Sequence, residues 1–339
     1  MMALTPLPLM ELSSGLFASK TLAAAVELGL FEALDIRPRD AQETADQLGL
    51  PLRPAKMLLG GCTALGLVVQ QDGRFANSAV ADTYLVPGRR WYFGDYIAML
   101  DRRVYAGWMR LAEALRTDRP TTWDPREKPS LFDPDDPAML RGFWRAMHSL
   151  SVYTASVLAQ GYDFSGIRRL LDVGGGGGAF TIELCRAHPH LTATIFDLPF
   201  VCEQTEQRVA EAGLSDRITC VAGDFFADVA LPGGHDAALL SSVLHDWSPA
   251  ENQVILDKVV AALPVGGQVL ISELLMDDDE TGPAPAALFN LLMLVETARG
   301  GNYSGAAYSE WLRAAGCVTV ARIPLDGVSA NAVLAGIKG

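Results

Sequence analysis

The sequence predicts an α/β protein: a doubly wound, mostly parallel sheet with helices on both faces, preceded by a helical N-terminal module. From residue 165 onward, short apolar runs alternate with helical patterns, which is typical of a parallel sheet covered on both faces. Five consecutive glycines, Gly174 to Gly178, follow the first of these runs and precede a helical pattern. A strand, a glycine turn and a helix in this order are typical of a nucleotide-binding fold.

The composition disfavours several classes of function. The 339 residues carry a formal net charge of −13, and nucleic-acid partners require clustered cations. The five cysteines form no C-x-x-C pair, so free thiols in a reducing cytoplasm are expected. The N-terminus lacks the pattern of a signal peptide, and no apolar run is long enough to span a bilayer. We therefore expect a cytoplasmic protein with neither a membrane nor a nucleic-acid partner.

Residues 1–90 are expected to form a helical, winged-helix dimerisation domain. Residues 1–35 read as helix with apolar side chains around most of the circumference, so either a partner subunit or the chain's own domain covers the second face. Residues 38–87 then predict two helices and a hairpin with its turn at 71–74. The second of these helices carries only Arg53 and Lys56 as cations, which favours packing and dimerisation over DNA binding.

Residues 91–163 are expected to form a helical linker that walls an acceptor pocket, and residues 164–339 a catalytic domain. The middle segment is mostly helical and rich in aromatic and methionine side chains. Such side chains suit either an ordinary core or the wall of an apolar ligand pocket. Phe143, Met147 and His148 share one helical face and are the candidates for that wall.

The catalytic domain should contain five strands in alternation with helices, followed by two strands without a helix between them. The last two strands therefore predict an antiparallel pair at the end of the sheet. The expected strands are 169–173, 192–196, 218–221, 236–241, 268–272, 318–323 and 332–337, and the expected helices include 180–187, 201–212 and 250–262.

Acidic and aromatic residues stand where the parallel strands end, and ligands bind over that edge of such a sheet. Asp197 follows the glycine turn by about 20 residues, where an acid can accept from two ribose hydroxyls. After the third strand, Asp224 can accept from an adenine amino group while Phe225 lies against the ring. A dinucleotide and S-adenosylmethionine (SAM) are both possible ligands. The Gly223-Asp224-Phe225 sequence and the antiparallel strand pair favour SAM.

Four motifs together resemble one enzyme family. They are Asp172-Val173-Gly174-Gly175-Gly176, Asp197-Leu198-Pro199, Gly223-Asp224-Phe225-Phe226 and His245-Asp246-Trp247-Ser248. In combination they resemble the small-molecule O-methyltransferases of the plant caffeate type and their bacterial natural-product relatives. The resemblance spans essentially the whole chain. It implies a class I methyltransferase fold, SAM as cofactor, a homodimer formed through the winged module, and a small aromatic acceptor.

The resemblance also implies roles for individual residues. His245 would be the general base, Glu273 would hold its ring, and Asp246 would belong to the same catalytic group. A phenol with a pKa of about 10 is within reach of an imidazole base when proton transfer accompanies attack, whereas an alkyl alcohol is much harder to activate. The residues expected to bind SAM are Asp172, Gly174, Gly176, Asp197, Leu198, Gly223, Asp224, Phe225, Ser241 and Trp247.

The sequence departs from the plant pattern where a second acid would support the base. The corresponding position holds Asn302, or Tyr303 if the gap moves by one, and Asn290 stands where an aspartate is common. Three outcomes fit: methylation of an acidic phenol, methylation of carbon or nitrogen, or SAM binding with hydroxylating, decarboxylating or pericyclic chemistry. A DNA-binding regulator with SAM as effector is a further alternative, which the charge pattern disfavours. The expected acceptor residues are Phe143, Met147, His148, Asn290, Met293, Asn302 and Tyr303.

The acidic run Asp277 to Glu280 is expected to be a solvated loop rather than a metal site. We predict no metal requirement, and loss of activity with a chelator would refute this.

Overall fold

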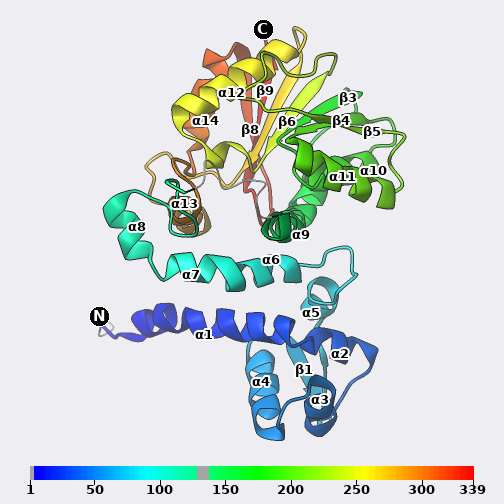
Figure 1. Cartoon of the computed structure of the whole chain (residues 1–339), viewed down its shortest axis with the longest axis vertical. Coiled ribbons are helices and arrows are strands. Elements are labelled where there is room, and N and C mark those ends of the chain that lie inside the picture. Colours follow the sequence, from blue (N-terminus) through cyan, green and yellow to red (C-terminus); the bar gives the residue numbers. More distant parts are fainter. Residues whose placement is uncertain (1–3, 128–136) are drawn as a thin grey trace. The chain divides into compact units, whose positions relative to one another are not determined.

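The computed structural model describes residues 4–127 and 137–339 (Figure 1). The chain divides into two compact units, Met1–Arg103 and Val104–Gly339. The predicted middle segment, 91–163, is therefore shared between the two units. A five-residue π-helix, η1 (Leu100–Val104), crosses the division.

The N-terminal unit contains the predicted pair of helices and hairpin. Asp40 caps α3, because its side chain accepts from the backbone of Glu43 while the Glu43 side chain accepts from the backbone of Asp40. Gly49 ends α3 in the left-handed conformation. The elements are α1 (Leu7–Glu27), α2 (Leu30–Ile36), α3 (Ala41–Leu48), α4 (Leu52–Ala64), β1 (Val68–Gln71), β2 (Arg74–Asn77), α5 (Ala79–Tyr84) and α6 (Gly94–Met99).

The first half of α1 exposes apolar side chains. Leu12 is 79% exposed and Phe17 is 70% exposed, whereas Ala23 and Ala25 in the second half are buried. Packing within the N-terminal unit therefore buries apolar side chains of the second half of α1 and leaves those of the first half exposed. The exposed apolar residues of this half, which we call the α1 apolar face, are Leu7, Leu9, Met10, Leu12, Leu16 and Phe17.

The C-terminal unit is built on a seven-stranded sheet with the order β5-β4-β3-β6-β7-β9-β8. Strands β3 to β7 run parallel, and β9 pairs antiparallel with both β7 and β8. The predicted fold class is thus confirmed, including the antiparallel end. The strands are β3 (Arg169–Val173), β4 (Thr192–Asp197), β5 (Ile218–Ala222), β6 (Ala237–Ser241), β7 (Gln268–Glu273), β8 (Cys317–Pro324) and β9 (Ala332–Lys338).

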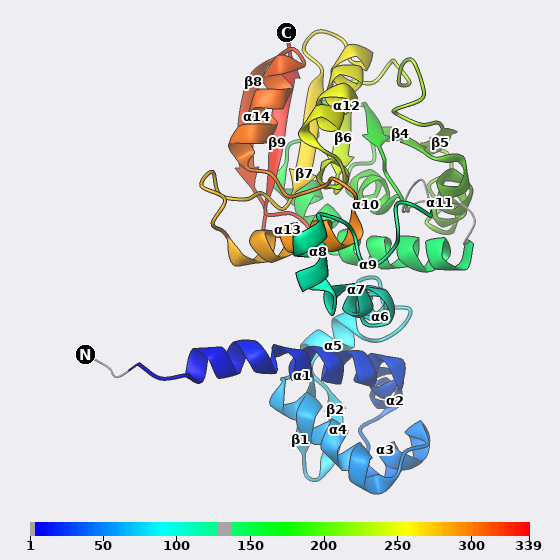
Figure 2. The same cartoon turned by 60° about the vertical axis from the view of Figure 1, so that its left-hand side comes forward.

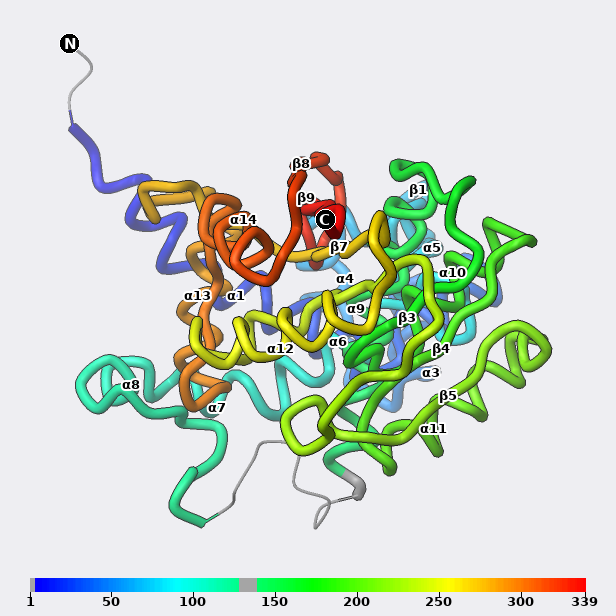
Figure 3. Tube along the Cα trace, turned by 90° about the horizontal axis from the view of Figure 1, so that it is seen from above, coloured from blue at the N-terminus to red at the C-terminus, as the bar shows by residue number. Residues whose placement is uncertain are grey.

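Two apolar cores cover the two faces of this sheet. Successive side chains of a strand point to opposite faces, and accordingly Leu170 belongs to one core and Leu171 to the other. The first core includes residues of α9 and α10, and the second includes residues of α12 and α14. Figure 3 shows α14 beside β8 and β9. The helices are α7 (Tyr105–Trp108), α8 (Leu111–Thr117), α9 (Pro137–Gly161), α10 (Ala179–Ala187), α11 (Pro199–Glu211), α12 (Pro249–Ala262), α13 (Ala284–Glu296) and α14 (Gly305–Ala314).

Helices α9 and α13 lie at one end of the sheet (Figures 1 and 2). Trp144 of α9 contacts the glycine turn that follows β3, and Phe289 of α13 contacts His245 beyond β6. These contacts identify that end as the carboxyl end of the parallel strands, where the sequence predicts the site.

No single helix in the described part of the chain is long and apolar enough to cross a membrane, although the bent pair α1 and α2 would together satisfy length and composition. Among residues 4–127 and 137–339, no three His, Cys, Asp or Glu side chains gather as a metal-binding group. The five cysteines are free thiols.

Candidate active site

The glycine turn after β3 is a backbone surface that tolerates no side chain. Gly174 and Gly176 adopt positive φ angles of 68° and 53°, which disfavour other residues. A Cβ atom on Gly174 would lie 2.9 Å from Val243, and one on Gly176 would lie 2.8 Å from the Trp144 ring. The turn therefore lets another group approach the backbone closely, as a nucleotide-type cofactor requires.

Two buried acids lie beside this turn, and one of them is hydrogen-bonded to its backbone. The Asp197 carboxylate accepts from the backbone N–H of Gly176 at 2.8 Å and from that of Leu198 at 2.7 Å. Burial raises the pKa of Asp197 to about 6, against these two hydrogen bonds. Asp172 is fully buried and accepts from the Thr181 hydroxyl at 2.6 Å, and burial raises its pKa to about 7. Both acids thus lie at the strand ends where the sequence predicts them, and Asp197 also supports the backbone of the turn.

An aromatic cluster follows β5 and meets the residues beyond β6. The Phe225, Phe226 and Trp247 rings pack edge to face, with centroids 4.7 to 5.8 Å apart. Gly223 has no room for a side chain, because a Cβ atom would collide with the Phe196 ring. A Cβ atom on Gly174 would lie 3.8 Å from Phe225, so the aromatic cluster borders the glycine turn.

Hydrogen bonds fix the loop that carries Phe225 and Phe226. The Asp224 carboxylate accepts from the Phe226 N–H at 2.7 Å. The Lys258 ammonium donates to the carbonyls of Phe225 and Asp228 at 2.8 and 2.7 Å. A side-chain-free turn, a buried acid and an aromatic wall together fit the methionine, ribose and adenine parts of SAM.

His245 stands on a short 3-10 helix, η2 (Leu244–Asp246), just beyond β6. Ser242, between β6 and η2, has a φ of 54°, a conformation that costs energy outside glycine and that clusters at functional sites. His245 Nδ1 lies 2.7 Å from Glu273 Oε2 at the end of β7. The other Glu273 oxygen accepts from the backbone N–H groups of Val243 and Leu244, each at 3.0 Å. Because the Glu273 carboxylate accepts, Nδ1 carries a proton, and Nε2 is the ring nitrogen left to take up or release one.

Two acids set the charge of His245. Burial by itself would lower the pKa of His245, but the charges of Glu273 and Asp246 and the Glu273 hydrogen bond outweigh it and raise the pKa to about 9. Asp246 Oδ1 lies 3.7 Å from His245 Nε2. Burial in turn raises the pKa of Asp246 to about 6. The arrangement therefore favours the imidazolium that a general base becomes when it accepts a proton.

The residues at the expected second-acid position hold backbone rather than the imidazole. The Tyr303 hydroxyl donates to the Trp247 carbonyl at 2.5 Å, and the Asn302 amide donates to the Ala286 carbonyl at 2.9 Å. The Asn290 side chain accepts from the Asn302 N–H at 2.9 Å. Contact of these three residues with an acceptor stays a prediction.

The other predicted acceptor residues lie on α9 and α13. His148 lies against Gly177 of the glycine turn, and burial with the charge of Arg208 lowers its pKa to about 4. Met293 is buried on α13, one helical turn beyond Phe289, whose ring centroid lies 5.4 Å from that of His245. Sequence reasoning missed the nearness of Trp144 and Phe289 to the site, because an apolar side chain on a helix carries no sign of what it packs against.

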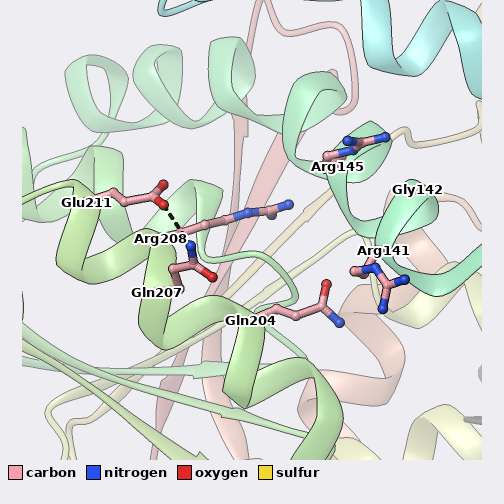
Figure 4. A pocket seen from close by; sticks show the side chains of 7 residues that line it. All are labelled: Arg141, Gly142, Arg145, Gln204, Gln207, Arg208 and Glu211. Carbon is pink, nitrogen blue, oxygen red and sulfur yellow. Dashed lines mark hydrogen bonds between the residues drawn. The ribbon is translucent and has the colours of Figure 1, made fainter. Parts of the chain in front are cut away.

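A cationic cavity of about 430 Å³ lies between α9 and α11 (Figure 4). The Arg208 guanidinium also lies against the glycine turn, so close that a Cβ atom on Gly177 would collide with it. The cavity is lined by Arg141, Gly142, Arg145, Gln204, Gln207, Arg208 and Glu211.

Two family models match the chain. Residues 10–87 match an O-methyltransferase dimerisation domain, and residues 108–318 match an O-methyltransferase domain. The first match lies within the unit Met1–Arg103 and the second within the unit Val104–Gly339.

Whole-chain relatives agree with these matches. The chain is 51% identical to a 3-hydroxy-5-methyl-1-naphthoate 3-O-methyltransferase of Streptomyces sahachiroi over 98% of this chain and 95% of the relative. It is 34% identical to an L-tyrosine C(3)-methyltransferase of Streptomyces lavendulae over 96% and 90% of the two chains. The crystal structure of human N-acetylserotonin methyltransferase in complex with SAM superposes with a TM-score of 0.88 at 26% identity, covering 100% of this chain and 99% of that chain.

The resemblance predicted from the four motifs is confirmed by these matches. The chain belongs to the O-methyltransferase family and is a SAM-dependent O-methyltransferase that carries the family's dimerisation domain.

Proposed function

We propose that this enzyme transfers the methyl group of SAM to a phenolic hydroxyl of a small aromatic acceptor, with His245 as general base. The observation that carries the proposal is the buried hydrogen bond from His245 Nδ1 to Glu273 Oε2 at 2.7 Å. It fixes the tautomer in which Nε2 can accept a proton. The Streptomyces sahachiroi relative is named for a hydroxynaphthoate, which supports a fused or substituted phenol as acceptor.

Residues at the carboxyl ends of β3, β4 and β5 would hold SAM. Gly174 and Gly176 would lie along its methionine part, Asp197 would accept from the ribose, and Asp224 with Phe225 would face the adenine. When bound, SAM supplies an electrophilic methyl group. The remaining predicted cofactor contacts are those of Asp172, Leu198, Gly223, Ser241 and Trp247.

His245 would accept the phenol proton at Nε2 as the oxygen attacks the methyl group. The carboxylates of Glu273 and Asp246 stabilise the resulting imidazolium by charge. A positioned base contributes roughly 10²- to 10⁴-fold in rate. Alignment of the oxygen with the methyl group in a water-excluded site contributes the rest. Phe289 and Met293 share one face of α13 and would form the acceptor wall on the His245 side.

A test is incubation with SAM and a panel of hydroxynaphthoates and simpler phenols, followed by mass spectrometry and carbon NMR. The proposal predicts S-adenosylhomocysteine and a product with a methoxy carbon. A product methylated on ring carbon, the reaction named for the Streptomyces lavendulae relative, would contradict the phenolic hydroxyl as acceptor. A product lacking a new methyl group would also contradict the proposal.

We also propose that the enzyme works as a homodimer in the cytoplasm. The dimerisation-domain match and the α1 apolar face support the dimer. The free thiols of all five cysteines support a reducing compartment.

A further inference from the structure

The short segment that carries His245 is held by side chains from outside it. Asn252, in the first turns of α12, is fully buried. Its amide donates to the Leu244 carbonyl at 2.8 Å and to the Trp247 carbonyl at 3.3 Å. These two carbonyls stand on either side of His245 and Asp246, so one side chain spans the segment.

The loop after α13 holds the same segment from a second direction. The Tyr303 hydroxyl donates to the Trp247 carbonyl at 2.5 Å. This is the same carbonyl that the Asn252 amide contacts. Burial raises the pKa of Tyr303 to about 12, so this phenol stays a donor throughout the working pH range. The Gly301 N–H donates to the His245 carbonyl at 2.8 Å. Gly300 must lack a side chain, because a Cβ atom there would collide with that carbonyl.

Glu273 completes the attachment from the third direction. It accepts from the Val243 and Leu244 N–H groups and from the His245 ring. One carboxylate therefore fixes the ring and two N–H groups of the segment, while Asn252, Tyr303 and Gly301 hold the carbonyls of the segment. A general base must be placed to within a fraction of an ångström, because a displacement of 1 Å costs on the order of 10²-fold in rate.

We propose that Asn252 and Tyr303 are positioning residues for His245, which act together through the Trp247 carbonyl. Both side chains hold the backbone that carries the base, and Tyr303 is one of the two residues at which the family pattern would put a second carboxylate. The inference rests on the proposed role of His245 as general base. Tyr303 then supports catalysis by donating a hydrogen bond to the backbone, and not by presenting a carboxylate to the imidazole.

The test compares Tyr303→Phe, Asn252→Ala and the double variant with the parent enzyme at pH values where His245 is neutral. Tyr303→Phe removes one hydroxyl and leaves the ring packing intact. Each single variant should lower kcat about tenfold, with affinity for SAM unchanged. Asn252→Ala, at a residue that is not a predicted acceptor contact, should also leave KM for the acceptor unchanged. Because both residues act on one carbonyl, the double variant should lose less than the product of the single losses.

Two further measurements separate positioning from general support of the fold. The pKa in the pH profile of kcat/KM should fall in both variants, because a displaced His245 feels Glu273 less strongly. The proton NMR resonance of the His245 Nδ1–H should also shift.

The matched controls are Gln253→Ala and Tyr162→Phe. Gln253 follows Asn252 on α12, and its amide donates to Asp257 and to the Trp311 carbonyl. The Tyr162 hydroxyl donates to the Gln268 side chain. Both controls should keep kcat, the pH profile and the His245 resonance of the parent.

Parent-like kcat and an unmoved His245 resonance in Tyr303→Phe and Asn252→Ala would overturn the positioning role. If Asn252→Ala fails to fold, Tyr303→Phe alone decides the outcome. His245→Ala distinguishes this failure from failure of the proposed function. If His245→Ala is inactive while Tyr303→Phe and Asn252→Ala have normal activity, the positioning inference alone is wrong. If His245→Ala is active, the role of His245 as general base is contradicted.

Discussion

His245 Nδ1 and Glu273 Oε2 are 2.7 Å apart, and the two residues are 8% and 1% exposed. Glu273 also accepts from two backbone N–H groups through its other oxygen. One carboxylate therefore orients the imidazole and anchors the segment that carries it. This double role makes Glu273 sensitive to replacement even by its amide.

Glu273→Gln should lower kcat by roughly 10²- to 10⁴-fold, because the amide loses the charge that supports the imidazolium. The amide NH₂ must also face either the backbone N–H groups or the His245 ring. The first orientation leaves buried donors unsatisfied at a cost of about 1–3 kcal/mol, and the second favours the tautomer that carries its proton on Nε2 and so removes the base. Single-turnover kinetics and urea unfolding measure the two effects.

Glu183→Gln is the matched control. Glu183 is about as buried as Glu273, but its carboxylate pairs with Arg186 at 2.7 Å and not with His245. Parent-like turnover in Glu273→Gln would contradict the orienting role of the carboxylate.

The pH dependence of the reaction should report His245. Because the base must be neutral and its pKa is raised to about 9, kcat/KM should rise with pH and level off near pH 9. In Glu273→Gln the plateau should begin at lower pH, since the charge that raises the pKa is gone. A profile that is already flat at neutral pH in the parent enzyme would contradict this account.

The same shift has a consequence for stability. The folded-state pKa of His245 exceeds its ordinary value of 6.5. Its contribution to stability is therefore fully present below pH 6.5 and is lost as the pH rises through about 9. His245→Ala should remove this part of the pH dependence, and urea unfolding at a series of pH values between 6 and 10 would show it.

Gly176→Ala should weaken SAM binding by at least about tenfold, because the added methyl group meets the Trp144 ring in a backbone conformation unfavourable to alanine. Gly213→Ala is the matched control: its φ of 69° imposes similar strain, but no atom lies within 4 Å of the added group. Isothermal titration with SAM measures both variants. Equal affinities of the two variants would contradict the close approach at Gly176.

The strands followed from the sequence because each is a short apolar run between turn residues, and β3 has the predicted bounds Arg169–Val173. The alternation of strands and helices also brought Asp197, His245 and Glu273 to one edge, since parallel strands end together. The insertion of β9 between β7 and β8 is a non-local pairing that no local pattern reveals.

The supporting residues of the site were harder to predict for the same reason. Helical spacing showed that Met147 and His148 share a face with Phe143, but not that His148 meets Gly177. Asn302 and Tyr303 stand where the family pattern has an acid, but the sequence does not predict their partners. These depend on how the loop after α13 packs against α13 and against the segment that carries His245. Asn252 gave no local signal, because its partners are backbone carbonyls.

Replacing Leu12 and Phe17 together by glutamate should convert the proposed homodimer to a monomer. Two charges on the α1 apolar face would have to be desolvated in the interface. Light scattering coupled to size-exclusion chromatography measures the mass. Val229→Glu, at a site that is 97% exposed, should leave the dimer unchanged, and a dimeric double variant would contradict the role of this face.

The most direct test of the central claim is the rate of methyl transfer by His245→Ala in a single turnover, with SAM affinity measured on the same preparation. If His245 is the general base, the rate falls by roughly 10²- to 10⁴-fold while SAM binds as before, because the imidazole contributes to proton transfer and not to the cofactor cradle. A near-parental rate at unchanged SAM affinity would contradict that assignment.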